Sequence, residues 1–145
     1  MARVPAASDR LVGVLPDFLP MFSPAERADL LRRGLRRIWP ARTTLFRQDE
    51  DDTTVMIVLS GEVEVGSGAG DRPPQISGPG SLLGAVSALG RRPRSATAVA
   101  TTPVQAAVLP VEEFEGFLLS HRSDTAFQFL RILCERFARV DVQPP

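Results

Sequence analysis

LLGAVSALGRRPRSATAVA, residues 82–100, is the stretch of the sequence that decides the fold. It sets Arg94 between Pro93 and Ser95, inside a run of small apolar residues and directly before a segment that alternates like a β-strand. A cation in that place either reaches solvent or holds an anion. The rest of the chain has to decide between these two interpretations.

A β-strand pattern extends over residues 41–110, on both sides of Arg94. Short runs rich in β-branched residues alternate with turn residues, which is typical of a β-sandwich or barrel. The runs are TTLF (43–46), TVMIVLSGEVEV (54–65) with a turn at Ser60 and Gly61, PPQI (73–76), SATAVATT (95–102) and VQAAVLP (104–110). The acidic run QDEDD (48–52) lacks the spacing of a calcium loop, so we expect a solvated turn there.

Helical signals precede the β region. Prolines within residues 8–22 permit only short helical turns there. The SPAE motif then predicts a helix start, with Ser23 as the N-cap and Glu26 reaching back to it. Helical spacing continues to Ile38, and Pro40 ends it. We expect a solvated face for the arginines of this helix, Arg32, Arg33, Arg36 and Arg37.

Two helices are predicted after Pro110. Residues 111–120 read as a short helix with Phe114, Phe117 and Leu118 facing inward. Residues 125–140, capped by Ser123 or Asp124, are predicted to form a longer helix that is apolar on two sides and therefore needs two partners. One partner is the β region, and the other is a twin subunit, the rest of a longer protein or a ligand. No helix-turn-helix pattern follows, so we expect no DNA-binding domain.

Composition narrows the classes of function. The 17 basic residues are all arginine and balance 17 acidic residues, which argues against a general nucleic-acid or membrane binder. The single Cys134 fits a reducing cytoplasm, and no long apolar stretch or secretion signal is present. With one histidine, His121, and one cysteine, neither a metal cluster nor a nucleophile–base pair can be assembled, so we expect no enzyme.

The order of these elements over about residues 10–140 resembles a cyclic nucleotide-binding domain, as found in catabolite-activator-type regulators and in regulatory subunits of cyclic-AMP-dependent kinase. Two segments carry the resemblance most specifically: LFRQDEDDTTVMIVLSGEVEV (45–65) and LLGAVSALGRRPRSATAVATTPVQAAVLPVEEF (82–114). The resemblance implies an eight-stranded double-stranded β-helix, or jelly roll. It divides one domain, 1–145, into an N-terminal helical lead-in (1–40), a β-roll (41–110) with a phosphate-binding cassette (80–97), and C-terminal helices (111–141).

The resemblance also implies a binding site in the cassette. A guanidinium fork and the N–H groups at a helix start suit a cyclic phosphodiester. Arg94 would then hold the phosphate, Ser95 would add a hydroxyl, and Gly84 would let the backbone come close. The implied ligand-binding residues are Leu83, Gly84, Ala85, Val86, Arg94 and Ser95, with Leu133 and Phe137 as a base lid. Arg91 and Arg92 are expected to point to solvent.

Ala85 departs from the family pattern. The family has a glutamate here that accepts a hydrogen bond from the ribose 2′-hydroxyl, and a methyl group accepts none. An unpaired ligand hydroxyl costs on the order of 1.5 to 3 kcal/mol. Two hypotheses therefore remain. One is a receptor for cyclic AMP, preferred to cyclic GMP because of Ser95, that signals through its C-terminal helix to a protein partner or a twin subunit. The other is a degenerate fold that serves as an interaction or dimerisation module.

Overall fold

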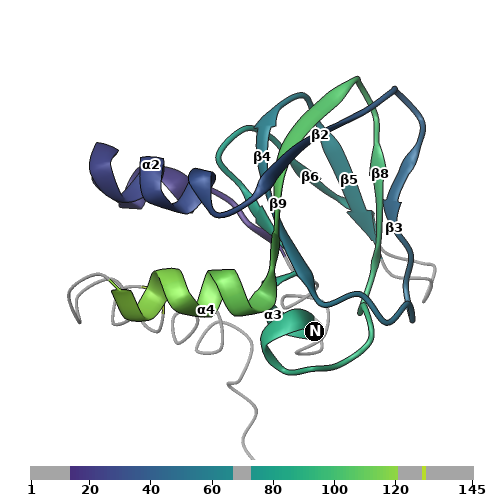
Figure 1. The fold of residues 1–145 in the computed structure, drawn as a ribbon. Helices are drawn as coiled ribbons and strands as arrows, with labels where there is room; N and C mark the ends of the chain where they lie inside the picture. The colour runs from purple at the N-terminus through teal and green to yellow at the C-terminus, as the bar shows by residue number, and fades with distance from the viewer. Residues whose placement is uncertain (1–13, 67–72, 121–128, 130–145) are drawn as a thin grey trace, which may run out of the picture.

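The computed structural model describes residues 14–66, 73–120 and 129, and their nine strands form two sheets (Figure 1). The five-stranded sheet has the order β1-β7-β4-β9-β2, and the four-stranded sheet has the order β3-β8-β5-β6. The strands are β1 (Val14–Leu15), β2 (Leu35–Trp39), β3 (Thr44–Phe46), β4 (Thr54–Ser60), β5 (Val63–Gly66), β6 (Gln75–Ser77), β7 (Leu82–Leu83), β8 (Thr97–Ala100) and β9 (Val104–Pro110). All pairings are antiparallel.

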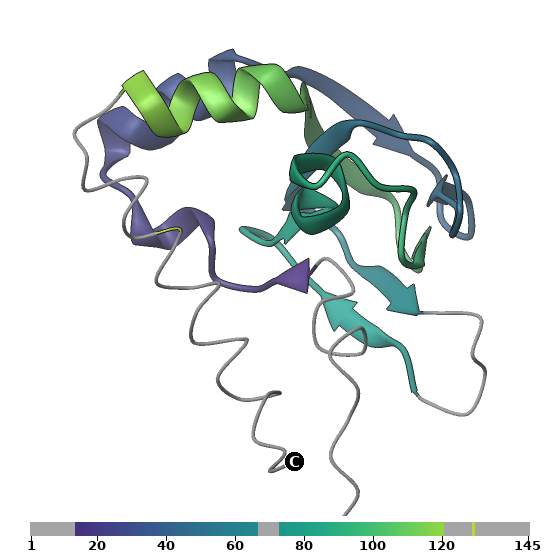
Figure 2. The same ribbon diagram turned by 90° about the horizontal axis from the view of Figure 1, so that it is seen from below.

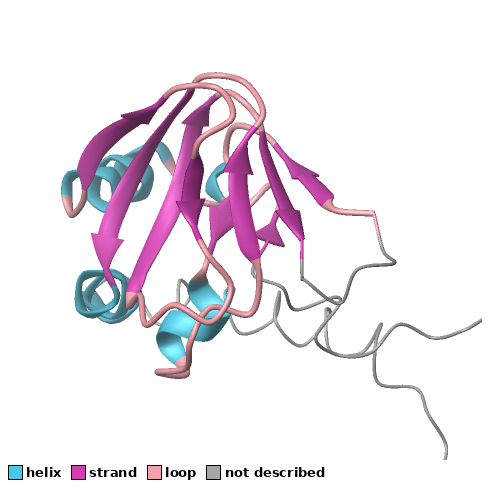
Figure 3. Cartoon of the chain, turned by 90° about the vertical axis from the view of Figure 1, so that its right-hand side faces the viewer, coloured by secondary structure: helices cyan, strands magenta, loops and turns pink. Residues whose placement is uncertain are grey.

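Helices gather at one side of the strands (Figure 3). They are the 3-10 helix η1 (Leu19–Met21), α2 (Pro24–Arg32), α3 (Ala85–Leu89) and α4 (Val111–Ser120). This arrangement confirms the predicted mostly β, jelly-roll-like fold with an N-terminal and a C-terminal helix. Residues 41–110 contain seven strands, β3 to β9, and two further strands lie upstream of them.

Strand alternation divides the core into two apolar clusters. Along β4, Met56 and Val58 face the four-stranded sheet, whereas Val55 and Ile57 face the helices. The cluster between the sheets is closed by small residues of β8, and the cluster under the helices is rich in phenylalanine. The four-stranded sheet therefore offers an inner face lined by small side chains, next to the segment that carries Arg94.

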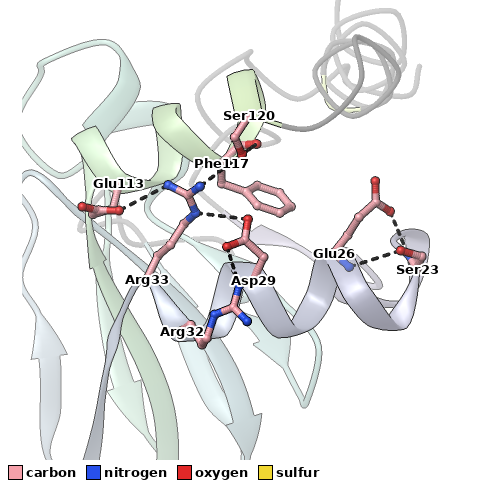
Figure 4. A network of polar contacts seen from close by, with 8 residues as sticks. All are labelled: Ser23, Glu26, Asp29, Arg32, Arg33, Glu113, Phe117 and Ser120. Atoms are coloured by element: carbon pink, nitrogen blue, oxygen red, sulfur yellow. Dashed lines mark hydrogen bonds and ion pairs between the residues drawn. The ribbon is translucent and has the colours of Figure 1, made fainter.

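Helices α2 and α4 lie side by side (Figures 1 and 2) and are joined by an ion pair and a hydrogen bond between their side chains (Figure 4). The predicted capping box at the start of α2 is confirmed: Ser23 Oγ accepts from the Glu26 N–H, and the Glu26 carboxylate accepts from the Ser23 N–H. At the other end of α2, the Arg33 guanidinium bridges Asp29 to Glu113 and donates to Ser120 Oγ at 3.1 Å. Arg33 thus connects α2 to α4 instead of extending into solvent.

The prediction that the first helix continues to Ile38 was wrong. The helix ends at Arg32, and residues 35–39 form β2, paired over its whole length with β9. Gly34 explains the break, because a Cβ there would meet the Val108 carbonyl oxygen at 2.8 Å and Leu109 Cγ at 2.9 Å. The backbone hydrogen-bonding groups of residues 35–39, which helical spacing had assigned to a helix, are instead paired with β9.

The lead-in was also predicted to contain only helical turns, yet Val14 and Leu15 form the short strand β1 beside β7. The predicted helix over 125–140 lies outside the described residues except for Phe129, which is helical and 5% exposed. His121, Cys134, Leu133 and Phe137 lie outside them too. None of the described helices combines the length and the apolarity that a bilayer crossing requires.

Candidate functional site

Arg94 lies between α3 and β8 and is buried, with 1% of its surface exposed. Its Nη1 donates to the Gly84 carbonyl at 3.0 Å and to Ser87 Oγ at 3.3 Å. Its Nη2 donates to the Thr54 carbonyl at 2.7 Å and to Thr54 Oγ1 at 3.2 Å. The guanidinium therefore ties the cassette to the start of β4 and does not reach solvent.

Asp52 neutralises this buried charge. Its Oδ2 lies 3.0 Å from Arg94 Nη2, and its Oδ1 accepts from the N–H and hydroxyl of Thr54. Burial acts to raise the pKa of Asp52, but the Thr54 hydrogen bonds and the Arg94 charge outweigh it, so the pKa lies below its ordinary value. Burial lowers the pKa of Arg94, and Asp52 opposes that shift. The two groups form a charged pair at neutral pH.

The acidic turn is joined to Arg94 through the backbone as well. The Arg94 N–H donates to the Glu50 carbonyl at 2.9 Å, and the Asp49 N–H donates to the Arg94 carbonyl at 2.8 Å. On the sheet side, the Arg94 guanidinium carbon lies 4.2 Å from the centre of the Phe46 ring. The predicted solvated turn at 48–52 is thus partly wrong: Asp49 and Glu50 are exposed, but the turn is bonded to the cassette.

The glycine of the cassette allows this approach. Gly84 is the N-cap of α3 with φ of 80°, and a Cβ on it would overlap Arg94 Nη1. Leu83 in β7 and Ala85 in α3 are buried, and Ala85 belongs to the apolar cluster under the helices. Val86 is half-buried. The methyl of Ala85 is packed in the core.

Ser95 is exposed, although it follows Arg94 directly. Arg91 is exposed and pairs with Glu115 of α4 at 3.2 Å, and Arg92 is exposed. The structure therefore brings Arg94 together with Gly84, while Ser95 extends away from that cluster.

Sequence reasoning missed the three distant side chains that contact the Arg94 guanidinium: Asp52, Thr54 and Phe46. They lie 40 or more residues away along the chain, and only the pairing of β3 with β8 and the start of β4 bring them close. One signal was available, since a buried arginine needs a carboxylate and QDEDD is the densest acidic run in the chain.

Three buried side-chain atoms have no hydrogen-bond partner in the described part of the chain: Arg94 Nε, Gln75 Oε1 and Ser77 Oγ. They are one guanidinium donor, one amide acceptor, and one hydroxyl that can donate or accept. Pairing of β3, β8, β5 and β6 puts Phe46, Ala98, Val65 and Gln75 in one row across the four-stranded sheet. Arg94 lies over the Phe46 end of this row, and Gln75 is at the other end, about 14 Å away by three strand spacings.

Comparison with known proteins points to one kind of domain for this chain. A family model described as "Cyclic nucleotide-binding domain" matches residues 36–121. The chain is 27% identical over 106 residues to the CRP-like cAMP-activated global transcriptional regulator of Mycobacterium tuberculosis, covering 71% of this chain and 47% of the relative. It is 33% identical over 96 residues to the acetyltransferase Pat of Mycolicibacterium smegmatis, covering 65% of this chain and 28% of that protein. The chain thus spans about half the length of the first relative and less than a third of the second.

Among solved structures, the catabolite activator protein of Thermus thermophilus superposes with a TM-score of 0.74 at 27% identity, covering 83% of this chain and 58% of that one. A second structure, of a kinase A regulatory-subunit domain with a bound cyclic-AMP analogue, has a TM-score of 0.62 at 18% identity, with 81% and 82% covered. The second likeness concerns the fold alone.

Proposed function

The chain belongs to the cyclic nucleotide-binding domain family, and we propose that it is a non-catalytic receptor for a cyclic nucleotide, cyclic AMP in preference to cyclic GMP. The observation that carries the proposal is the buried guanidinium of Arg94, whose Nε has no partner among the described residues. A relative of this chain is described as cAMP-activated, which supports the same ligand class.

The anionic end of the ligand belongs at Arg94. All four N–H groups of its two terminal nitrogens face acceptors, so Nε is the one donor still to be satisfied. A phosphodiester oxygen supplies that acceptor and a second negative charge beside Asp52. Asp52 then acts as the positioning residue that fixes the guanidinium plane.

The base belongs toward β6. Gln75 Oε1 is an acceptor and the Ser77 hydroxyl a donor or acceptor, neither has a partner among the described residues, and both sit across the same sheet face from Arg94. A glutamine side chain can accept from the exocyclic amine of adenine while donating to its N7. This complementarity favours cyclic AMP, and it replaces Ser95, which is exposed, as the reason for that preference.

Calorimetric titration of the full chain with cyclic AMP and cyclic GMP tests the proposal. We expect heat and a raised melting temperature with cyclic AMP, and weaker binding of cyclic GMP. Arg94→Lys keeps the charge but loses the guanidinium fork, so it should weaken binding by about tenfold or more, whereas Arg92→Lys, at an exposed position, should not. Absence of heat and of a melting shift at millimolar concentrations of both nucleotides would refute the receptor.

A second function, an interaction module that binds no nucleotide, is favoured by one arrangement. Arg94 already has a carboxylate partner in Asp52, and Ala85 offers the ribose no acceptor. This alternative predicts no nucleotide binding and a contact made by the C-terminal helices. The receptor's proposed output would use the same part of the molecule. There, Phe114 and Phe117 of α4 pack on Phe18 and Phe22, and Phe114 also contacts Phe129.

Signalling through the C-terminal helix requires that the ligand bind two helix positions with different affinity. Light scattering after size exclusion, with and without cyclic AMP, tests whether the output is a homodimer. A ligand-dependent change of mass supports this route. An unchanged monomer that binds the nucleotide would direct the search to a protein partner instead.

A further inference from the structure

Strand β2 leaves one edge of the five-stranded sheet open. Among the described strands, β9 is its sole hydrogen-bonded neighbour, and the sheet order ends with it. Leu35 and Ile38 are 76% and 74% exposed, and Arg36 and Arg37 between them are exposed as well. An exposed edge with large apolar residues is a template for adding another strand.

The two faces of this edge carry the same chemistry. Alternation puts Leu35 and Arg37 on the face of Trp39, and Arg36 and Ile38 on the opposite face. The Arg37 guanidinium lies 5.3 Å from the Trp39 ring centre, and neither Arg36 nor Arg37 forms an ion pair within the described part of the chain. Each face thus presents one aliphatic side chain and one uncompensated cation.

We propose that the β2 edge binds an extended segment of a partner protein in which two consecutive acidic residues are flanked by aliphatic residues, and that this segment adds to the sheet as a strand. Cross-strand pairing would then place an acid opposite each of Arg36 and Arg37, and an aliphatic residue opposite each of Leu35 and Ile38. The order aliphatic, cation, cation, aliphatic reads the same in both directions. A parallel or an antiparallel partner therefore satisfies it equally.

A second copy of this chain does not fit the same edge. When two β2 strands pair about a twofold axis, the one register that pairs all five residues of both strands brings Arg37 opposite Arg37. Like charges directly opposite each other destabilise a strand pair. The arginines thus oppose self-association and select an acidic occupant. This inference does not depend on nucleotide binding.

The probe is a capped hexapeptide of the order threonine, valine, glutamate, glutamate, valine, threonine. We expect it to bind the full chain in calorimetry, with NMR shift changes centred on the amides of 35–39. Its isomer with a glutamate, valine, valine, glutamate centre should bind at least about fivefold more weakly, and more weakly still with backbone N-methylation at the two central residues. Equal binding of the isomer, or of the N-methylated peptide, would overturn strand addition.

A charge swap distinguishes loss of the proposed contact from loss of folding, because an unfolded variant would bind neither peptide. The double variant Arg36→Glu with Arg37→Glu should lose the glutamate peptide and gain its lysine counterpart, while Arg47→Glu, at another exposed arginine, should behave as wild type. Unchanged binding in the double variant refutes the assigned surface. A short oligothymidylate that binds wild type more tightly than the peptide would overturn the choice of a protein partner in favour of a nucleic acid.

Discussion

At Arg94, one side chain combines the structural role that its contacts show with the binding role that we propose. Its two terminal nitrogens hold the cassette glycine and the start of β4, and its charge is balanced by Asp52. A buried charge is tolerated only with such compensation, because desolvation would otherwise neutralise it. Variants at position 94 therefore have to be checked for folding before binding, and the partner Asp52 gives a cleaner probe of the pair.

Asp52→Asn should lower the free energy of unfolding by about 1 to 3 kcal/mol at neutral pH, since it leaves the Arg94 charge unpaired. The pKa of Asp52 is lowered in the folded state, so the pair's stabilisation is present above the ordinary carboxyl pKa and is lost as the pH falls below about 4. Urea unfolding at several pH values should show a shallower acid dependence in the variant than in wild type. The exposed Asp51→Asn is the control, and identical slopes for all three proteins would contradict the assignment.

In the proposed receptor, Ala85 offers the ribose of the nucleotide no hydrogen-bond acceptor. Its side chain is 1% exposed and packs in an apolar cluster, so the 2′-hydroxyl of a bound nucleotide meets no carboxylate from this position. We expect 2′-deoxy cyclic AMP to bind within about twofold of cyclic AMP, because no charge-assisted hydrogen bond is lost. Competition calorimetry measures the ratio. A tenfold weaker deoxy analogue would mean that another residue reads this hydroxyl.

At the scale of elements, the short helix α3 and its glycine fix the position of the guanidinium. Gly84→Ala should destabilise the fold by about 2 kcal/mol or more, since φ of 80° disfavours a side chain and the added Cβ would overlap Arg94. Gly78→Ala is the matched control, because a Cβ there has no atom within 4 Å. Melting temperatures of the two variants check this prediction, and equal values would be inconsistent with a tight approach at Gly84.

Some helices and strands of this fold can be predicted from the sequence, and others cannot. Strands β3, β4, β5, β8 and β9 follow from alternation and turn residues, and α2 follows from the Ser23 capping box. Strand β2 does not, since Leu35 and Ile38 also match helical spacing and the deciding bonds come from β9, about seventy residues later. The site divides in the same way: Arg94 and Gly84 were identified from the cassette, but Asp52 and Phe46 become neighbours only through long-range pairing.

At the scale of the whole molecule, an aromatic cluster joins the lead-in to the C-terminal helices. The Phe18 ring contacts the rings of Phe22, Phe114 and Phe129, with centroids 5.0 to 6.0 Å apart. These residues come from three separate parts of the chain. The helices are therefore held to the sheets, and to one another, through Phe18.

Phe18→Ala should lower the free energy of unfolding by about 3 to 5 kcal/mol, because it removes a large buried side chain and leaves a cavity among the other rings. Thermal and urea unfolding measure the loss. Met21→Ala, at a side chain that is 45% exposed nearby in the chain, should cost far less. Comparable losses in the two variants would show that the cluster is not the joint between helices and sheets.

Two backbone hydrogen bonds join the acidic turn to residue 94, and they can report on ligand binding without an attached probe. Deuterium uptake at the Asp49 and Arg94 amides measures how often this junction opens, because each of the two N–H groups is protected only by the other segment. A small molecule that tightens the junction slows uptake at both amides together. Metabolite mixtures can therefore be screened by measuring, with mass spectrometry, the deuterium uptake of the two peptides that contain Asp49 and Arg94.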